Sequence, residues 1–330
     1  MLIVSLRRFR LESVAIAGGL LAVGMLALVT GRMMSDEYHD SGLANCLATS
    51  SRSSCDGLID SFGNSFSSLQ ILILPLVLLP ALLGAFVGAP LIARELEHGT
   101  HRFLWTQGIT RRRWLGYMAG GALGLALVAG ALYSLIAAVW LDITNKVTDD
   151  RFGQMYDFQG LVPIAAGVFA VAVGIACGLI MRRTLPAMIA TIGIFIVVRL
   201  TTAIVLRPHF AAAKTLETEF GPDDPLSGTG AWVLSRDTVT ADGLVIGREG
   251  SLNISGLERY CPALDNASPM NPPREGDVQQ CLEQLGVHSV IRYHPGNRFW
   301  TFQLIESGLM LALAGAAMLV AARALNRRPS

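Results

Sequence analysis

Six long apolar stretches alternate with polar segments along the chain. A transmembrane helix needs roughly 17–25 mostly apolar residues, and each stretch has about that length. Charged residues make up only 15% of the chain, against about 25% in an ordinary soluble domain. The pattern predicts an all-α polytopic membrane protein. Its six predicted transmembrane helices span residues 13–31, 71–93, 115–140, 161–181, 185–206 and 301–322.

The arginines indicate the direction in which these predicted helices cross the membrane. Short loops with an excess of Lys and Arg stay in the cytoplasm, and such residues gather at both termini and after the second and fourth helices. We therefore expect both termini to be cytoplasmic and segments 32–70, 141–160 and 207–299 to be extracellular. The basic groups are Arg7, Arg8 and Arg10; Arg94, Arg102, Arg111, Arg112 and Arg113; Arg182 and Arg183; and Arg323, Arg327 and Arg328.

One extracellular segment, 207–299, is long enough to fold as a separate domain. Its run TVTADGLVI places Asp242 and Gly243 between two strand-like halves, which is a hairpin signal, and VIRYHPGNRFW has a similar pattern around Pro295 and Gly296. We predict a small extracellular α+β domain between the fifth and sixth helices.

Three regions follow from this plan. The N-terminal sequence MLIVSLRRFRLES suits an amphipathic helix on the inner membrane surface, with a frayed basic terminus as the alternative. Residues 1–206 then hold this helix, transmembrane helices 1–5 and the cytoplasmic loop 94–114; residues 207–299 form the extracellular domain; residues 300–330 hold the sixth helix and the cytoplasmic tail.

Four of the five cysteines lie in predicted extracellular segments, where an oxidising environment preserves disulfides. Cys46 and Cys55 share the first segment, and Cys261 and Cys281 share the last. We expect pairing within each segment, although four cysteines allow three connectivities and free thiols are the alternative. Cys177 lies in the fourth apolar stretch and is expected to be a small packing residue.

Two predicted helices carry a small residue at every fourth position. Small residues let helix backbones approach closely in a bilayer. Packing within one chain and packing against a second copy both remain open. The stripes are Gly116, Gly120 and Gly124 in the third helix, and Ala166, Ala170, Gly174 and Gly178 in the fourth.

Arg199 and Glu306 are ionisable residues inside the fifth and sixth predicted helices. Such residues cost about 2.5–3.5 kcal/mol on insertion scales and usually have a partner or a task. Both lie at a similar depth in the outer half of the membrane, so an ion pair between them is possible, with Gln303 one turn from Glu306. We expect these three residues to line or brace the outer half of a pathway. The alternative is that the charged groups snorkel to the interface.

The sequence contains few motifs that are typical of enzymes. No G-x-x-x-x-G-K-[ST] phosphate loop occurs, so the chain does not bind ATP through a Walker motif. His98 and His101 lie near Glu95 and Glu97, but H-x-x-H is not the zincin spacing H-E-x-x-H and has no obvious further ligand. We predict no catalytic residue, no metal site and no cofactor in this chain.

The sequence LIARELEHGTHRFLWTQGITRRRW, residues 91–114, interrupts the apolar pattern between the second and third helices. Glycine just after a helix and threonine just before the next are typical helix boundaries, and each of these signals occurs twice. They predict a short helix at the cytoplasmic membrane surface, suited to a groove on a cytoplasmic partner. The boundary residues are Gly99, Thr100, Gly108 and Thr110, and the apolar side is Phe103, Leu104 and Trp105.

The order I-x-R-E-x-E-x-G-T, a short helix and T-x-x-R resembles the first cytoplasmic loop of type-2 ABC exporter permeases. E-x-E-H-G-T-H with W-T-Q, and R-F-W-x-F-Q-x-I-E where the chain returns to the membrane, are similar to actinobacterial permease subunits. Many relatives have a proline after the short helix, where this chain has Gln107 and Gly108. The matching residues are Ile92, Arg94, Glu95 to His101, Trp105 to Gln107, Thr110, Arg113 and Arg298 to Glu306.

The resemblance implies that the short helix is a coupling helix seated on a separate cytoplasmic ABC ATPase subunit, which binds ATP and Mg. It implies two permease halves, the second being another copy or a paralogue, in the lipid of a bacterial plasma membrane; we expect no nucleic-acid partner. The implied ATPase contacts are Glu95, Glu97, His98, Gly99, Thr100, Phe103 and Trp105.

We therefore predict the transmembrane permease subunit of an ATP-binding-cassette exporter. It is expected to move an amphipathic drug, peptide or lipid-like substrate outward. The alternative is a membrane receptor or sensor subunit whose extracellular domain binds a ligand and which signals through a cytoplasmic partner. A third class, an intramembrane enzyme, would have only Arg199, Gln303 and Glu306 to work with.

Overall fold

The computed structural model describes residues 10–50, 52–67, 76–98, 110–149, 151–153, 155–219, 224–248, 251–252, 281–282 and 284–326. The chain divides into two compact units. The helical unit takes its described residues from 1–148, 154–210 and 299–330, and the sheet unit takes them from 149–153 and 211–298.

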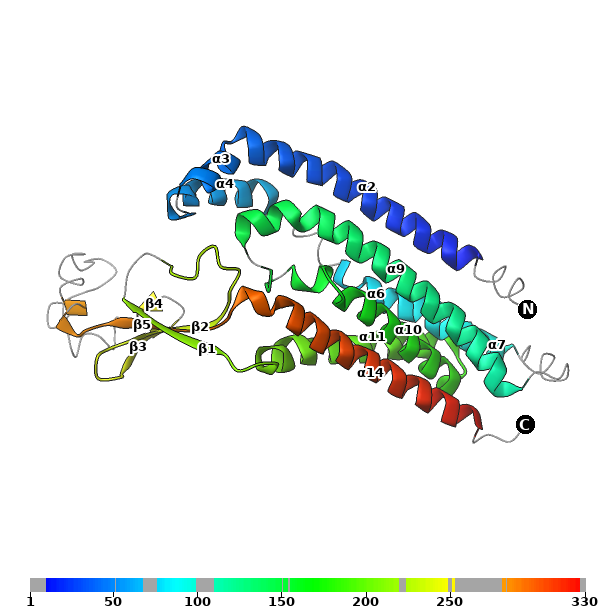
Figure 1. Cartoon of the computed structure of the whole chain (residues 1–330). Helices are drawn as coiled ribbons and strands as arrows, with labels where there is room; N and C mark the ends of the chain where they lie inside the picture. Colours follow the sequence, from blue (N-terminus) through cyan, green and yellow to red (C-terminus); the bar gives the residue numbers. More distant parts are fainter. Residues whose placement is uncertain are drawn as a thin grey trace, which may run out of the picture. The chain divides into compact units, whose positions relative to one another are not determined.

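The described part of the helical unit contains six segments that are long and apolar enough to cross a membrane, which confirms the predicted number. Figure 1 shows them running side by side. They are α2 (Arg10–Asp40); α6 (Leu79–Leu83) continuing through η3 (Gly84–Gly88) into α7 (Ala89–Glu97); α9 (Arg111–Thr148); α10 (Val162–Met181); α11 (Thr184–Leu200) continuing through η5 (Thr201–Leu206) into η6 (Arg207–His209); and α14 (Phe299–Asn326).

Helices α2 and α9 extend furthest beyond their predicted ends. α2 continues to Asp40, and α9 continues to Thr148. The predicted ends mark where the apolar run stops, but a helix can continue into water because its backbone hydrogen bonds are made internally. In the extension of α9, Lys146 Nζ donates to Asp142 Oδ2 at 2.6 Å, a pairing one turn apart that supports an exposed helix.

The first membrane-length helix begins, and the last one ends, at the same end of the helical unit. In Figure 1, the start of α2 and the end of α14 are found there, together with the end of α7 and the start of α9. This arrangement fits an even number of crossings. The assignment of that end to the cytoplasm remains a prediction.

The two stripes of small residues have different surroundings. A Cβ added at Gly174 or Gly178 of α10 would collide with backbone atoms of η3 and α7, so these glycines permit close helix packing. At Gly116, Gly120 and Gly124 of α9, an added Cβ would have no atom within 4 Å. The α10 stripe therefore packs within the chain, whereas the described part of the chain leaves the α9 stripe uncovered.

The segment after α2 forms a small helical cap. It comprises α3 (Leu43–Thr49), η1 (Arg52–Cys55) and α4 (Asp56–Phe66). A disulfide joins Cys46 to Cys55, with 6.0 Å between the Cα atoms, which confirms this predicted pair. Buried Leu43 and Phe62 pack with Val147 of α9. Cys281 is also disulfide-bonded, and Cys261 lies outside the described residues.

The sheet unit contains an antiparallel sheet with strand order β1-β5-β2-β3-β4. The predicted β2–β3 hairpin is confirmed, and Gly243 in its turn has φ +83°. The second predicted hairpin is wrong, because β5 leads through η8 (Gly296–Arg298) into α14. Proline lacks the N–H needed to continue a ladder, and Pro295 follows the last residue of β5. The strands are β1 (Lys214–Glu219), β2 (Trp232–Val239), β3 (Val245–Arg248), β4 (Ser251–Leu252) and β5 (His288–His294).

The short segment that follows α9 belongs to the sheet unit. Asp149 Oδ2 accepts a 2.5 Å hydrogen bond from the N–H of Gly230. Phe152 stacks on Trp232 of β2, with ring centroids 5.8 Å apart. These long-range contacts attach residues 149–153 to the sheet, although hydropathy alone assigns them to a loop between two membrane helices.

Candidate functional site

Four charged side chains meet in the helical unit, close to the end at which α14 begins. They are Arg199 of α11, Arg207 of η6, Glu306 of α14 and Asp157 of η4 (Tyr156–Phe158). Glu306 is completely buried, the two arginine side chains are nearly so, and the Asp157 side chain is 24% exposed. We call this group the charged cluster.

Each carboxylate of the charged cluster contacts both guanidinium groups. Arg207 binds Glu306 through Nε at 2.9 Å and Nη2 at 3.0 Å, and its Nη2 also donates to Asp157 Oδ1 at 2.5 Å. Arg199 forms ion pairs with Glu306 and Asp157. Two positive and two negative charges therefore balance within a buried space, where a single unpaired charge is strongly unfavourable.

A π-helical turn brings the two arginines onto the same neighbour. Residues eight positions apart in a regular α-helix differ in direction by about 80°. The π-helix η5 lies between Arg199 and Arg207, and its i→i+5 bonds take more residues per turn. Eight residues then come closer to two full turns, so both side chains reach Glu306.

The sequence reasoning identified half of this cluster. It placed Arg199 and Glu306 together, but it missed Arg207 and Asp157, which it assigned to extracellular segments. Charge balance could have found them. Arg207 lies directly after the end of the fifth predicted helix, so a second buried arginine there requires a second carboxylate nearby. The π turn itself has no recognisable sequence pattern here.

Gln303, one turn before Glu306, is hydrogen-bonded to the start of α10. Its Oε1 accepts hydrogen bonds from the N–H groups of Leu161 at 2.9 Å and Val162 at 3.0 Å. The first N–H groups of a helix have no partner within the helix, so Gln303 satisfies two of them. At Gly160, where φ is +74°, a Cβ would touch this amide. Gln303 thus braces the structure around the cluster.

An aromatic ring covers one side of the charged cluster. The guanidinium carbon of Arg207 lies 4.1 Å from the centroid of the Tyr156 ring, which is cation–π geometry. Burial, and then the negative charge of Glu306, raise the pKa of Tyr156 well above its ordinary value. The phenol therefore stays neutral and adds no charge to the balance.

Three of the seven predicted ATPase-contact residues lie at the opposite end of the helical unit. Glu95 is buried, whereas Glu97 and His98 are exposed at the end of α7. Glu97 Oε2 accepts hydrogen bonds from Thr184, and His98 Nδ1 lies 2.9 Å from the carbonyl oxygen of Arg94. The other four residues, Gly99, Thr100, Phe103 and Trp105, and the predicted short helix lie outside the described residues.

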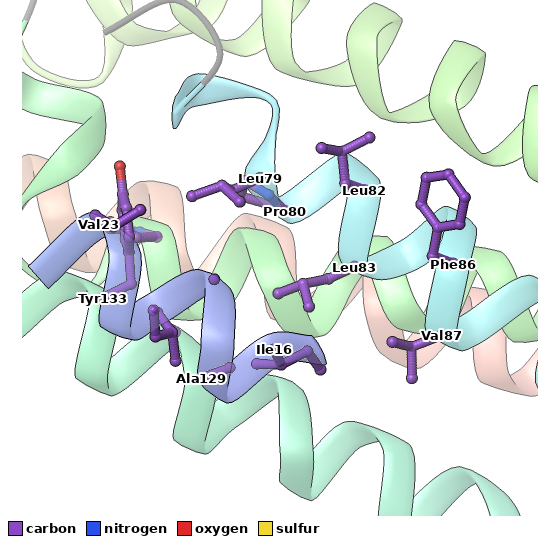
Figure 2. Close-up of a pocket in the computed structure, with 14 residues that line it drawn as sticks. Ile16, Val23, Leu79, Pro80, Leu82, Leu83, Phe86, Val87, Ala129 and Tyr133 are labelled. Carbon is purple, nitrogen blue, oxygen red and sulfur yellow. The ribbon is translucent and has the colours of Figure 1, made fainter. Parts of the chain in front are cut away.

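An apolar pocket of about 340 Å³ lies between α2, the α6–η3 segment and α9. Figure 2 draws Tyr133 of α9, Val23 of α2 and Leu79 of α6 among the side chains that line it. The pocket volume falls in the usual range of about 300–1,000 Å³ for small-molecule sites. Within the described structure, the buried Tyr133 hydroxyl has no hydrogen-bond partner. Sequence reasoning missed this pocket because its walls come from three helices distant in sequence.

The described residues contain no group of three or more His, Cys, Asp or Glu side chains placed to hold a metal ion. The charged cluster is instead a closed set of ion pairs. Its chemistry is suited to holding helices in a defined arrangement and to releasing them when the pairs separate.

A family model described as "ABC-2 membrane transporter related" matches residues 17–207. The match covers more than half of the chain, from α2 to the first residue of η6, and includes Arg199 and Arg207. No curated protein and no solved structure matches the chain.

Proposed function

The chain belongs to the ABC-2 membrane transporter related family, and from this membership we propose that it is the permease subunit of an exporter that moves an amphipathic substrate outward. The family supports an ABC-transporter permease, a multi-pass membrane protein that associates with a cytoplasmic ATPase subunit. The observation that carries the proposal is this match across five of the six membrane-crossing segments. It favours a permease over a receptor or sensor.

The partner ATPase binds ATP and Mg, and it contacts the cytoplasmic loop that follows α7. The arginine distribution supports a cytoplasmic position for this loop, because its neighbours Arg111, Arg112 and Arg113 begin α9. Coexpression with an ATPase encoded beside this gene, followed by purification, tests the complex. We expect the two chains to copurify, and we expect Gly99→Trp in the loop to reduce copurification. An ATPase that never copurifies with the wild-type chain would contradict the proposal.

The apolar pocket supports a substrate with a sizeable apolar part, because its accessible walls are apolar. Gly18 and Gly19 of α2 provide a matched test, since a Cβ at either position meets no atom within 4 Å but only Gly19 lines the pocket. We expect Gly19→Phe to weaken binding of a fluorescent amphiphile by about tenfold and Gly18→Phe to leave it unchanged. Equal effects of the two substitutions would remove the pocket from the substrate route.

The charged cluster braces the outer half of the transport pathway. Its four side chains pair with one another, so opening of the pathway at this end must separate or move these ion pairs. Glu306→Gln and Arg199→Gln each remove one charge; the first leaves the size unchanged, whereas the second also shortens the side chain. We expect both variants to be expressed and to bind the ATPase but to lose transport. Unchanged transport in both would exclude this role.

A second permease half, identical or paralogous, completes the transporter in a bacterial plasma membrane. The uncovered α9 stripe supports a helix contact with such a partner, because small residues permit close approach. We expect Gly120→Leu to lower the yield of cross-linked dimers without altering the fold of one chain. A dimer yield equal to that of the wild type would place the contact elsewhere.

A further inference from the structure

Helix α11 is capped by a residue from another helix. Its own N-cap residue, Arg183, has an extended backbone and makes no side-chain capping bond. The Oε2 atom of Glu97, the last residue of α7, accepts hydrogen bonds from the Thr184 N–H at 3.2 Å and the Thr184 hydroxyl at 2.8 Å. A carboxylate at a helix N-terminus is favoured by the helix dipole. The end of α7 is thereby joined to the start of α11.

The helix that carries Glu97 packs closely against α10. An added Cβ at Gly178 of α10 would lie 2.5 Å from the carbonyl oxygen of Ala89 in α7. Most residues of α7 are buried, but Glu97 itself is exposed. Exposed hydrogen-bonded charges contribute little to stability, so the value of this contact lies in the position that it gives to α11.

The fully buried residues of α11 form one stripe, which ends in the charged cluster. Its buried residues are Ala187, Thr191, Phe195 and Arg199, which recur every four positions. Thr184 and Leu200 are about 24 Å apart along the axis, at 1.5 Å per residue. A helix that is hydrogen-bonded at both ends can transmit a displacement from one end to the other.

We propose that Glu97 is a positioning residue that joins the loop after α7 to α11, and through α11 to the charged cluster. The inference rests on the proposed function, because the bound ATPase supplies the movement of the loop. When the end of α7 moves, the Glu97–Thr184 contact carries α11 with it. Arg199 and Arg207 then shift relative to Glu306 and Asp157.

Hydrogen–deuterium exchange of the full chain tests this coupling in nanodiscs of phosphatidylethanolamine and phosphatidylglycerol. In Glu97→Ala, we expect amide exchange to accelerate by about threefold or more in the first turn of α11 and also in η5 at its far end. Thr184→Ser keeps both hydrogen-bond donors and should match the wild type. Asp142→Asn removes an exposed carboxylate of α9 that pairs within its own helix and does not link two helices. It should leave amide exchange unchanged both in the first turn of α11 and in η5.

An effect confined to the first turn of α11 would make Glu97 a local cap and overturn the proposal, as would no effect. A second comparison adds the ATPase subunit with and without ATP. We expect ATP to change exchange in η5 of the wild type but not in η5 of Glu97→Ala. Failure of the wild-type chain to bind the ATPase would contradict the proposed function, while the remote effect of Glu97→Ala in the chain alone would still be measured.

Discussion

The two ends of α11 are both held by hydrogen-bonded carboxylates, but in different surroundings. At one end, buried Glu306 and partly exposed Asp157 pair with Arg199 and Arg207. At the other end, exposed Glu97 binds Thr184. Separating buried charges has a high free-energy cost, whereas water readily replaces an exposed contact. The difference indicates that the Glu306 end holds the helices together and that the Glu97 end adjusts their position.

The largest effect is expected from Glu306→Ala, which leaves two buried guanidinium groups with only Asp157. Removing one partner of a buried ion pair typically destabilises a protein by about 3–5 kcal/mol. Thermal unfolding in detergent, followed by size-exclusion chromatography, measures the loss. Ser307→Ala is the matched control, because Ser307 is the next residue and is buried but uncharged. Equal losses for the two variants would break the comparison between the ends of α11.

Gln303→Leu is expected to have the second-largest effect. It removes the acceptor of the Leu161 and Val162 N–H groups, and buried donors left unsatisfied cost about 1–3 kcal/mol. The start of α10 should unfold locally, so amide exchange at these two residues reports the loss directly. Unchanged protection of both amides would mean that another acceptor replaces Gln303.

Glu97→Ala tests the comparison from the other side. It removes the acceptor of both Thr184 hydrogen bonds, but the site is exposed. We expect a smaller fall in the melting temperature than for Gln303→Leu, together with a clear loss of ATP-driven transport. A fall as large as that of Glu306→Ala would show that both ends of α11 serve stability equally.

Lys146→Gln is expected to have the smallest effect. Lys146 and Asp142 form an exposed pair one turn apart on α9, with side chains 59% and 60% exposed. Such pairs contribute little because water screens them. Melting temperature and transport should both match the wild type. A measurable loss of either would show that exposure does not separate weak from strong contacts in this chain.

The sequence predicted the features that depend on local composition. Apolar length located the six helices, and similar membrane depth identified Arg199 and Glu306 as possible partners. Arg207 and Asp157 were missed because their positions depend on a π turn and on a loop packed against two helices. The function of Gln303 depends on where α10 begins in space, which no local pattern records.

The stripes of small residues show the same limit. A spacing of four residues correctly identified the α10 stripe as a surface that packs closely. It did not distinguish Gly174, which meets backbone atoms of η3 and α7, from Gly120, which meets no atom within 4 Å. Which helix faces a stripe is decided by tertiary packing, as is the pocket between α2, α6 and α9.

The most direct test of the account measures ATP hydrolysis and substrate flux together in proteoliposomes that contain this chain and its ATPase. For the wild type, we predict outward flux of a fluorescent amphiphile that requires ATP. For Glu306→Gln, we predict that hydrolysis continues while flux is lost, because the ATPase still binds but the charged cluster no longer orders the helices. Flux that is independent of ATP, or equal flux in the two proteins, would contradict the account.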